Sequence, residues 1–396
     1  MLTPANDQPG RYDLICFSHL RWGFVFQRPQ HLLTRCAKSR RVFFVEEPVL
    51  GDGEARLDLT WDASGVCVVT PHLPAYFDTT TRDSEQARLM SQLCKEHAIV
   101  DYVLWFYTPM ALPAAAQLTP LAMAYDCMDE LSAFKDPPRE LLERETQLFG
   151  VVDVVYTGGH ALFEHKRHLH PDVHAFPSSV DRGHFAQARC AQASPADQAD
   201  IPGPRLGFFG VIDERMDLAL LEGVARLRPS WNLVLLGPVV KVDPRDLPRL
   251  PNIHYLGIKT YGELPRYIAG WDVALLPFAK NEATRFISPT KTPEYLAAGK
   301  PVVSTSIRDV VRPYSVQGLV RIADTPEDFV LACEAALKEP HLGWLERADA
   351  FLARQSWDAT WAGMQRLLDI AVQRQRSGKS GEHRLLDVHE PTREVG

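Results

Sequence analysis

The chain has 396 residues, of which 45% are hydrophobic and 23% charged, as in globular proteins that bury large cores and fold as about two or three domains. Its formal net charge of −7 argues against nucleic-acid binding, because proteins that bind nucleic acids gather positive charge on one face. No apolar run reaches the roughly 18 residues that a membrane-spanning helix needs, and the first residues lack the basic-then-apolar order of a signal peptide.

In the first part of the chain, short apolar runs alternate with longer amphipathic runs. The apolar runs predict buried strands at residues 13–18, 41–48, 65–71, 102–107, 121–126 and 152–157. The amphipathic runs predict helices at residues 30–39, 82–97 and 137–150. This alternation predicts an α/β domain, residues 1–185, whose parallel sheet is covered by helices on both faces.

A segment rich in Ala, Gln, Asp and Pro, residues 186–204, interrupts this rhythm, and we interpret it as an interdomain linker. The alternation resumes in a second domain, residues 205–358, with strands predicted at 205–210, 232–238, 252–257, 272–278, 301–305 and 319–323. Helices are predicted at 216–229, 263–270, 326–339 and 342–375, and the polar tail, residues 376–396, is predicted to be disordered. Two such halves predict two doubly wound domains that face each other across a cleft, where ligands bind beyond the carboxyl ends of the strands.

One candidate site follows the strand at residues 272–278. The chain there passes through a polar loop into a helix, whose free N–H groups can bind a phosphate or diphosphate together with the side chains of Lys291 and Arg285. Glu294 lies one turn into the helix and can accept hydrogen bonds from the two hydroxyls of a ribose. The residues predicted to bind a nucleotide here are Arg285, Ser288, Thr290, Lys291 and Glu294. Alternatively, Glu294 only favours the helix N-terminal dipole and Lys291 is solvated.

Further candidates follow two strands of the first domain. The loop at residues 18–30 should overhang the cleft, and it offers His19, Arg21, Trp22, Gln27 and Arg28 to the diphosphate or to a sugar. Another strand ends at the same edge, where Asp126 or Asp129 could orient a sugar hydroxyl or act as a weak base. The candidates for catalysis are therefore His19, Asp126 and Asp129. Alternatively, the aromatic side chains only anchor the loop, and Asp129 only caps the next turn.

Several patterns argue against other classes of enzyme and site. The chain contains no G-x-G-x-x-G, no Walker loop and no H-E-x-x-H, which removes the usual support for a nicotinamide enzyme, a P-loop NTPase or a zincin. His165 and His168 have a spacing that metal ligands use, but Lys166 and Arg167 between them favour a solvated basic face. Because none of the seven cysteines forms a C-x-x-C pair, we expect reduced thiols in a cytoplasmic protein. We therefore expect no metal site and no cofactor.

The segment P-T-K-x-x-E-Y-L-A-A-G-K-P-V-V, at residues 289–303, resembles the nucleotide-sugar motif of GT-B glycosyltransferases of the glycosyltransferase family 4 type, whose domain is called glycosyl transferases group 1. Residues 176–185, 205–221 and 252–278 resemble further signatures of that family. Residues 17–35 and 124–130 are similar to a bacterial branch found among surface-polysaccharide enzymes.

The resemblance implies a GT-B fold and transfer of a sugar from a nucleotide-diphosphate donor, UDP- or GDP-linked, to a glycan or lipid-linked acceptor. It also implies retention at the anomeric carbon, a reaction independent of metal, and a helix, residues 359–375, that crosses back to the first domain. In the family pattern a glutamate binds the ribose, matched by Glu294, and Arg215 matches a cation that binds the diphosphate.

The family pattern usually has a second glutamate eight residues earlier, which contacts the donor sugar. The chain has Phe286 at that position. Either Glu282 or the backbone near Ser288 takes over this contact, or the sugar is held differently. Two other functions stay open. One is a nucleotide-sugar epimerase on the same scaffold, and the other, which Phe286 suggests, is a non-catalytic partner that binds a nucleotide sugar. For the transferase we expect a cytoplasmic location. Peripheral contact of the protein with the inner membrane face is compatible with that location.

Overall fold

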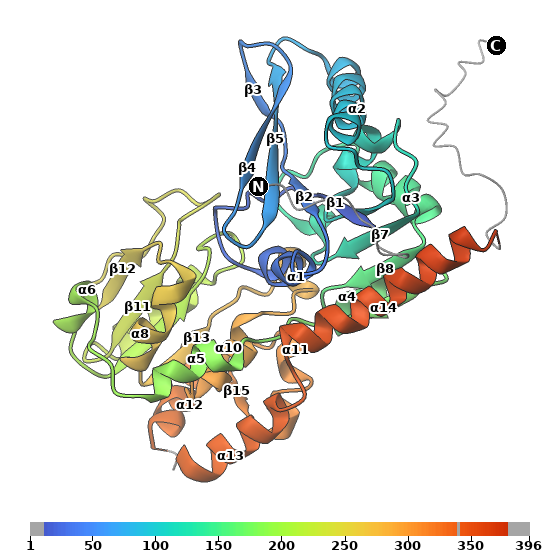
Figure 1. Ribbon diagram of the computed structural model, residues 1–396. Helices are drawn as coiled ribbons and strands as arrows, with labels where there is room; N and C mark the ends of the chain where they lie inside the picture. Colours follow the sequence, from blue (N-terminus) through green and yellow to red (C-terminus); the bar gives the residue numbers. More distant parts are fainter. Residues whose placement is uncertain (1–11, 339–340, 379–396) are drawn as a thin grey trace, which may run out of the picture.

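The computed structural model describes residues 12–338 and 341–378, which form two α/β domains (Figure 1). Each domain is built on a largely parallel sheet, as the alternation of runs predicts. The part of the predicted tail from residue 379 onward lies outside the described residues.

The N-terminal domain contains the following elements, in which η marks a 3₁₀ helix: β1 (Asp13–Phe17), α1 (Arg28–Cys36), β2 (Val42–Val45), β3 (Val49–Gly51), β4 (Arg56–Trp61), β5 (Val66–Pro74), α2 (Thr79–Glu96), β6 (Tyr102–Phe106), η1 (Pro109–Ala115), β7 (Ala122–Cys127), η2 (Leu131–Ala133), α3 (Leu141–Val151), β8 (Val154–Thr157), α4 (His160–Lys166) and β9 (Val173–Ala175). The sheet has the order β3-β5-β2-β1-β6-β7-β8-β9, with β4 antiparallel to β5. All residues of β1, β2, β6, β7 and β8 are buried, because helices cover both faces of the sheet. The sequence patterns missed β4, since its residues are exposed or half-buried and form no apolar run.

The C-terminal domain contains β10 (Arg205–Phe209), α7 (Leu218–Leu227), β11 (Asn232–Leu236), β12 (Ile253–Gly257), η4 (Tyr261–Glu263), α8 (Leu264–Ala269), β13 (Val273–Leu276), α9 (Glu282–Arg285), α10 (Lys291–Ala297), β14 (Val302–Ser304), α11 (Arg308–Val311), η5 (Ser315–Gln317), β15 (Val320–Ile322), α12 (Pro326–Lys338) and α13 (His341–Leu352). Its parallel sheet has the order β12-β11-β10-β13-β14-β15. The strand order reverses around β1 in one sheet and around β10 in the other. In doubly wound sheets this reversal opens a crevice at the carboxyl ends of the strands.

The segment between the two sheets packs against the C-terminal domain and is not a loose linker. It contains α5 (Arg182–Ala186), η3 (Gln187–Arg189) and α6 (Ala196–Ala199). The fully buried side chain of Gln198 accepts a hydrogen bond from Trp271 Nε1 at 2.9 Å and donates one to the Tyr267 carbonyl at 3.0 Å. The polar residues of this segment led to the prediction of a linker, but Gln198 among them forms buried hydrogen bonds.

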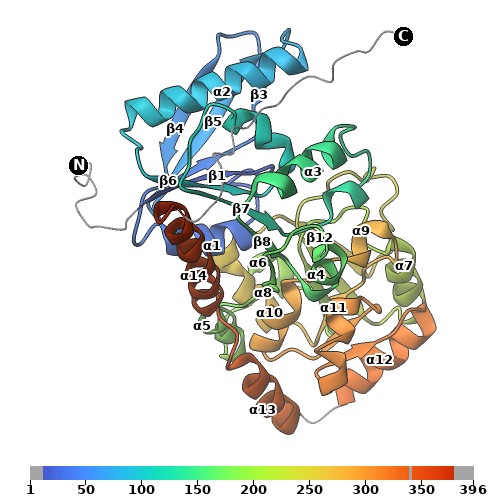
Figure 2. The same cartoon turned by 90° about the vertical axis from the view of Figure 1, so that its right-hand side faces the viewer.

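The last described helix, α14 (Trp357–Arg376), lies against the N-terminal domain beside α1, whereas α13 lies with the C-terminal domain (Figure 2). The long helical run predicted at residues 342–375 is thus divided, because Ser356 caps a new helix by accepting from the Ala359 N–H at 3.1 Å. Trp357, Trp361 and Met364 join the core formed by β1 and α1. Within residues 12–338 and 341–378, no helix is long and apolar enough to cross a membrane.

Replacing His31 of α1 with phenylalanine is expected to make the chain less sensitive to mild acid. The His31 ring stacks on Trp357 of α14, with centroids 4.5 Å apart, and burial together with the nearby Arg35 and His184 lowers its pKa to about 3. An unfolded histidine has a pKa near 6.5. Between about pH 6.5 and pH 3 the unfolded chain therefore binds a proton that the folded chain does not, and stability falls as the pH falls.

The effect amounts to at most about 1.4 kcal/mol per pH unit. Thermal unfolding at pH 7.5 and pH 5 measures it: the drop in Tm should be smaller for His31→Phe than for the unchanged chain. His168→Phe, at an exposed histidine, is the control and should keep the full drop. Equal drops for His31→Phe and the unchanged chain would contradict the buried, neutral state of His31.

Candidate functional site

A cavity of about 620 Å³ lies between the two domains, at the carboxyl ends of strands from both sheets. The N-terminal domain contributes the loop after β1 and the residues after β7, and the C-terminal domain contributes the residues after β10 and β13. The volume is in the range of small-molecule and cofactor sites.

Lys291 and Glu294 of α10 both line this cavity. Glu294 is only 5% exposed, yet across the described residues neither side chain has a hydrogen-bond or ion-pair partner. Burial lowers the pKa of Lys291 and raises the pKa of Glu294, while the charge of each opposes the shift of the other. Two buried ionisable groups that face a cavity without hydrogen-bond or ion-pair partners form a site suited to a polar ligand.

The wall beside Lys291 is formed by Gly210, which follows β10 and has a φ of +139°. A Cβ atom at this position would lie 2.1 Å from Lys291 Cε, so a larger residue would displace the lysine. Arg215 adds a second cation to the cavity. Asp213 forms an ion pair with Arg215 at 2.7 Å. The Arg215 guanidinium lies 5.4 Å from the ring of Phe134 of the N-terminal domain. Sequence patterns missed Gly210 and Asp213, although the D-x-R spacing of Asp213 and Arg215 was visible.

Another part of the cavity is bounded by Tyr261 of η4, which the sequence patterns also missed. Its ring stacks on Phe26 of the N-terminal domain at 4.6 Å and on His184 at 4.1 Å. Its buried hydroxyl has no partner within residues 12–338 and 341–378. Burial and the charge of Glu294 raise the pKa of this hydroxyl, and both residues line the cavity. An aromatic edge, a hydroxyl and a carboxylate thus meet at this end of the cavity.

Most of the predicted site residues line this cavity: Trp22, Gln27, Arg28, Asp129, Arg215, Ser288, Thr290, Lys291 and Glu294. The others, His19, Arg21, Asp126 and Arg285, lie outside it. The cavity therefore brings together residues more than 260 positions apart in the sequence, from the loop at 18–30 and from α10.

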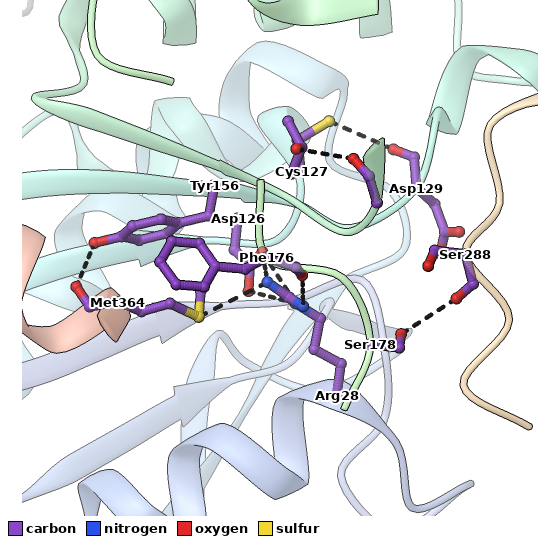
Figure 3. Close-up of polar contacts among 11 residues, drawn as sticks. Arg28, Asp126, Cys127, Asp129, Tyr156, Phe176, Ser178, Ser288 and Met364 are labelled. Carbon is purple, nitrogen blue, oxygen red and sulfur yellow. Dashed lines mark hydrogen bonds and ion pairs between the residues drawn. The ribbon is translucent and has the colours of Figure 1, made fainter. Parts of the chain in front are cut away.

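The prediction that Asp126 takes part in catalysis is wrong, because this carboxylate is fully buried and bound to Arg28 (Figure 3). Arg28 Nε lies 3.1 and 3.0 Å from the two Asp126 oxygens, and Nη2 lies 2.9 Å from one of them. Arg28 also donates to the Phe176 carbonyl at 2.7 Å and approaches Met364 Sδ of α14 at 3.8 Å. The pair joins α1, β7 and α14, and its charges are already neutralised.

Arg21 and Arg285 are occupied elsewhere. Arg21 Nη1 donates to Glu46 at 3.0 Å and to the Glu47 carbonyl at 2.7 Å. The side chain of Arg285 is 64% exposed, lies 3.4 Å from Glu282 and does not line the cavity, so the structure gives the predicted phosphate contact no support. A sequence pattern does not show which of several nearby carboxylates will form an ion pair with an arginine in the folded chain.

His19 does not reach the cavity either. Burial lowers the pKa of His19 to about 4, although a hydrogen bond with the Tyr107 backbone opposes this shift. The ring is therefore neutral near pH 7, and its Nδ1 has no partner across the part of the chain described. As placed, it does not support the predicted catalytic role.

Asp129 and Ser288 face each other across the domain boundary (Figure 3). Asp129 follows β7, and its backbone carbonyl accepts a hydrogen bond from Cys127 Sγ at 3.6 Å. The Ser288 carbonyl accepts a hydrogen bond from the Ser178 hydroxyl of the N-terminal domain at 3.2 Å. Neither contact involves the Asp129 side chain, and Asp129 lines the cavity.

The start of α10 offers fewer free amides than the sequence suggested. The helix has seven residues, and the Thr292 N–H already donates to the Pro289 carbonyl at 3.1 Å. The positive charge beside the cavity therefore comes mainly from the side chains of Lys291 and Arg215.

The predicted substitutes for the missing glutamate differ in position. The side chain of Glu282 is 73% exposed and outside the cavity, whereas Ser288 lines it. Phe286 turns away and stacks on His165 of α4, with ring centroids 4.5 Å apart. In the described part of the chain, no group of three or more His, Cys, Asp or Glu side chains is arranged to hold a metal ion.

Comparison with known proteins agrees with this geometry. The family model described as Glycosyl transferases group 1 matches residues 203–339, which contain Gly210, Arg215, Lys291 and Glu294. Most of the C-terminal domain is therefore similar to the glycosyl transferases group 1 family. A curated relative, the putative teichuronic acid biosynthesis glycosyltransferase TuaH of Bacillus subtilis (strain 168), is 33% identical over 174 residues. That match covers 42% of this chain and 42% of the relative's own length.

Solved structures show the same fold over most of the chain. Sucrose-phosphate synthase from Thermosynechococcus elongatus superposes with a TM-score of 0.68 at 14% identity, over 93% of this chain and 100% of that one. HepE from Anabaena, in complex with UDP and glucose, superposes with a TM-score of 0.65 at 11% identity, over 90% and 99% of the two chains. The predicted GT-B fold is confirmed.

Proposed function

We propose that this protein transfers a sugar from a nucleotide-diphosphate donor to a hydroxyl group of a glycan or lipid-linked acceptor. The observation that carries the proposal is the pair Lys291 and Glu294, which face the interdomain cavity without a hydrogen-bond or ion-pair partner among the described residues. The similarity to glycosyl transferases group 1 and the name of the TuaH relative support the same activity.

In this proposal each side chain binds the part of the donor that its chemistry suits. Lys291 and Arg215 bind the diphosphate, because ammonium and guanidinium groups donate charged hydrogen bonds to phosphate oxygens. Glu294 accepts hydrogen bonds from the ribose diol, with the Tyr261 hydroxyl close by. UDP or GDP is the nucleotide we favour, and UDP occupies the HepE structure of the same fold.

The transfer breaks the bond between the anomeric carbon and the diphosphate oxygen, and the electron pair leaves with the diphosphate. The acceptor hydroxyl oxygen forms the new bond to that carbon, and its proton passes to an oxygen of the leaving diphosphate. Lys291 and Arg215 stabilise the charge that develops on the leaving group. We propose a retaining reaction, on the resemblance to glycosyltransferase family 4.

The acceptor we propose is a growing surface polysaccharide or its lipid-linked precursor. The resemblance of the N-terminal segments to surface-polysaccharide enzymes and the name of the TuaH relative support this choice. Such an acceptor would bring the protein into peripheral contact with the inner face of a membrane.

Product analysis by mass spectrometry tests the proposed activity. The purified chain is incubated with UDP- or GDP-sugars, with and without a mixture of lipid-linked acceptors. We expect free nucleoside diphosphate together with a glycosylated acceptor, and only slow hydrolysis when the acceptor is omitted. An isomeric nucleotide sugar would instead identify an epimerase, and no product despite nucleotide binding would identify a non-catalytic partner.

The same assay tests whether the reaction needs a metal. Because Lys291 and Arg215 neutralise the diphosphate in this proposal, turnover is expected to stay within about twofold after addition of EDTA. Loss of turnover on chelation, restored by manganese or magnesium, would contradict the proposed role of the two cations.

A further inference from the structure

The loop at residues 279–290 borders the cavity but offers it no carboxylate. Glu282 is 73% exposed at its side chain and pairs with Arg285. Phe286 packs against the core of the N-terminal domain and stacks on His165. The residues that the loop does present to the cavity are Ile287, Ser288, Pro289 and Thr290. None of these has a charged side chain that could hold the hydroxyls of a sugar.

Within residues 12–338 and 341–378, the carboxylates that line the cavity are Asp62, Asp129, Glu263 and Glu294. Two of them are already occupied. Asp62 accepts from the Ser64 N–H at 2.8 Å, and Glu263 accepts from the Thr260 N–H at 2.9 Å and the Thr260 hydroxyl at 2.6 Å. Glu294 lies beside Tyr261, at the end assigned above to the nucleoside. Asp129 is the remaining carboxylate.

Asp129 lines the same cavity as Lys291 and Arg215, the two cations assigned above to the diphosphate. Its side chain comes from the N-terminal domain and points toward the Ser288 segment of the C-terminal domain (Figure 3). Burial raises the pKa of Asp129, and the positive charges of Arg215, Arg28 and Lys291 oppose the shift. Asp129, Arg215 and Lys291 line the same cavity, and no hydrogen bond within the described residues occupies the Asp129 side chain.

We propose that Asp129 binds hydroxyl groups of the donor sugar, across the cleft from Lys291 and Arg215. This inference rests on the proposed function, because it requires a sugar diphosphate in the cavity. An ionised carboxylate has two acceptor oxygens and can take hydrogen bonds from two neighbouring hydroxyls. It also repels a second carboxylate, so the site selects an uncharged sugar over a uronic acid.

The test is the Asp129→Asn variant, in which an amide replaces the carboxylate with little change in shape. Isothermal titration measures the Kd for UDP, UDP-glucose and UDP-glucuronate, or for the guanosine equivalents with mannose and mannuronate if GDP binds the unchanged chain more tightly. Binding of UDP or GDP alone should be unchanged or tighter, because the variant removes a negative charge near the diphosphate. Affinity for the neutral nucleotide sugar, relative to the bare diphosphate, should fall about tenfold to a hundredfold. The preference over the uronate should shrink as well.

Glu282→Gln is the matched control, since it makes the same change in an exposed carboxylate of the neighbouring loop and should alter none of these constants. Loss of sugar-dependent affinity in Ser288→Ala but not in Asp129→Asn would overturn the proposal in favour of the loop. Loss of bare diphosphate binding in Asp129→Asn would also overturn it, because the residue would then act on the nucleotide. If the unchanged chain binds no nucleotide at all, the proposed function itself fails, which is distinct from either result.

Discussion

Replacing Glu294 with glutamine is expected to weaken binding of both the bare nucleoside and the nucleoside diphosphate about tenfold to a hundredfold. The variant keeps the side-chain shape but removes the charge and one acceptor oxygen from the buried group that faces the cavity. A hydrogen bond to a charged group contributes about 1.5–3 kcal/mol, which corresponds to this range of Kd. Isothermal titration with uridine, UDP, guanosine and GDP measures the change.

Lys291→Ala is the companion variant. It should weaken binding of the diphosphate and of nucleotide sugars but leave the bare nucleoside almost unaffected, because the ammonium group reaches only the phosphates in this site. If Glu294 were merely a favourable charge at a helix start, Glu294→Gln would cost about 0.3–1 kcal/mol of stability and leave every Kd intact. A lower Tm with unchanged nucleoside affinity would therefore contradict the ribose contact.

Replacing Arg28 with methionine is expected to lower the free energy of unfolding by about 3–5 kcal/mol. Asp126 would remain as an uncompensated charge at a fully buried position, since Arg28 supplies all of its ion-pair contacts shown in Figure 3. The Phe176 carbonyl would also lose its donor. Thermal unfolding of the variant and the unchanged chain at pH 7 measures the loss as a fall in Tm.

The double variant Arg28→Met with Asp126→Leu distinguishes a structural pair from a binding residue. Apolar replacement of both partners removes the orphaned charge, so the double variant should be more stable than Arg28→Met alone. Its affinity for nucleoside diphosphate should stay close to that of the unchanged chain, because the charge of Arg28 is already neutralised. A large loss of diphosphate affinity in the double variant would contradict this account and show that Arg28 binds the donor.

The strands and most helices could be predicted because their signal is local. Buried parallel strands such as β1 and β6 read as unbroken apolar runs, and the amphipathic period of α2 and α12 is visible in single windows. The weaker elements, β3 and β4, lie at an edge with exposed side chains and give no such run.

The candidate site could be predicted where its residues lie close together in the sequence. Lys291 and Glu294 occupy one short helix, so their common direction toward the cavity follows from helical spacing. Asp126, Arg21 and Arg285 were misassigned because each found a partner in another part of the chain or within its own turn. Partner choice of this kind depends on tertiary packing. Tyr261 was missed for the same reason, since folding of the C-terminal domain brings it into the cavity with Glu294, and the domain arrangement stacks it on Phe26.

A crystal structure of the chain with UDP-glucose or GDP-mannose, whichever binds more tightly, tests the proposed site most directly. We expect the diphosphate oxygens within hydrogen-bonding distance of Lys291 and Arg215, the ribose hydroxyls on Glu294 beside Tyr261, and the sugar directed toward Asp129. A nucleotide bound outside the interdomain cavity, or one bound in reverse with its base toward Asp129, would contradict the assignment of this cavity as a nucleotide-sugar site.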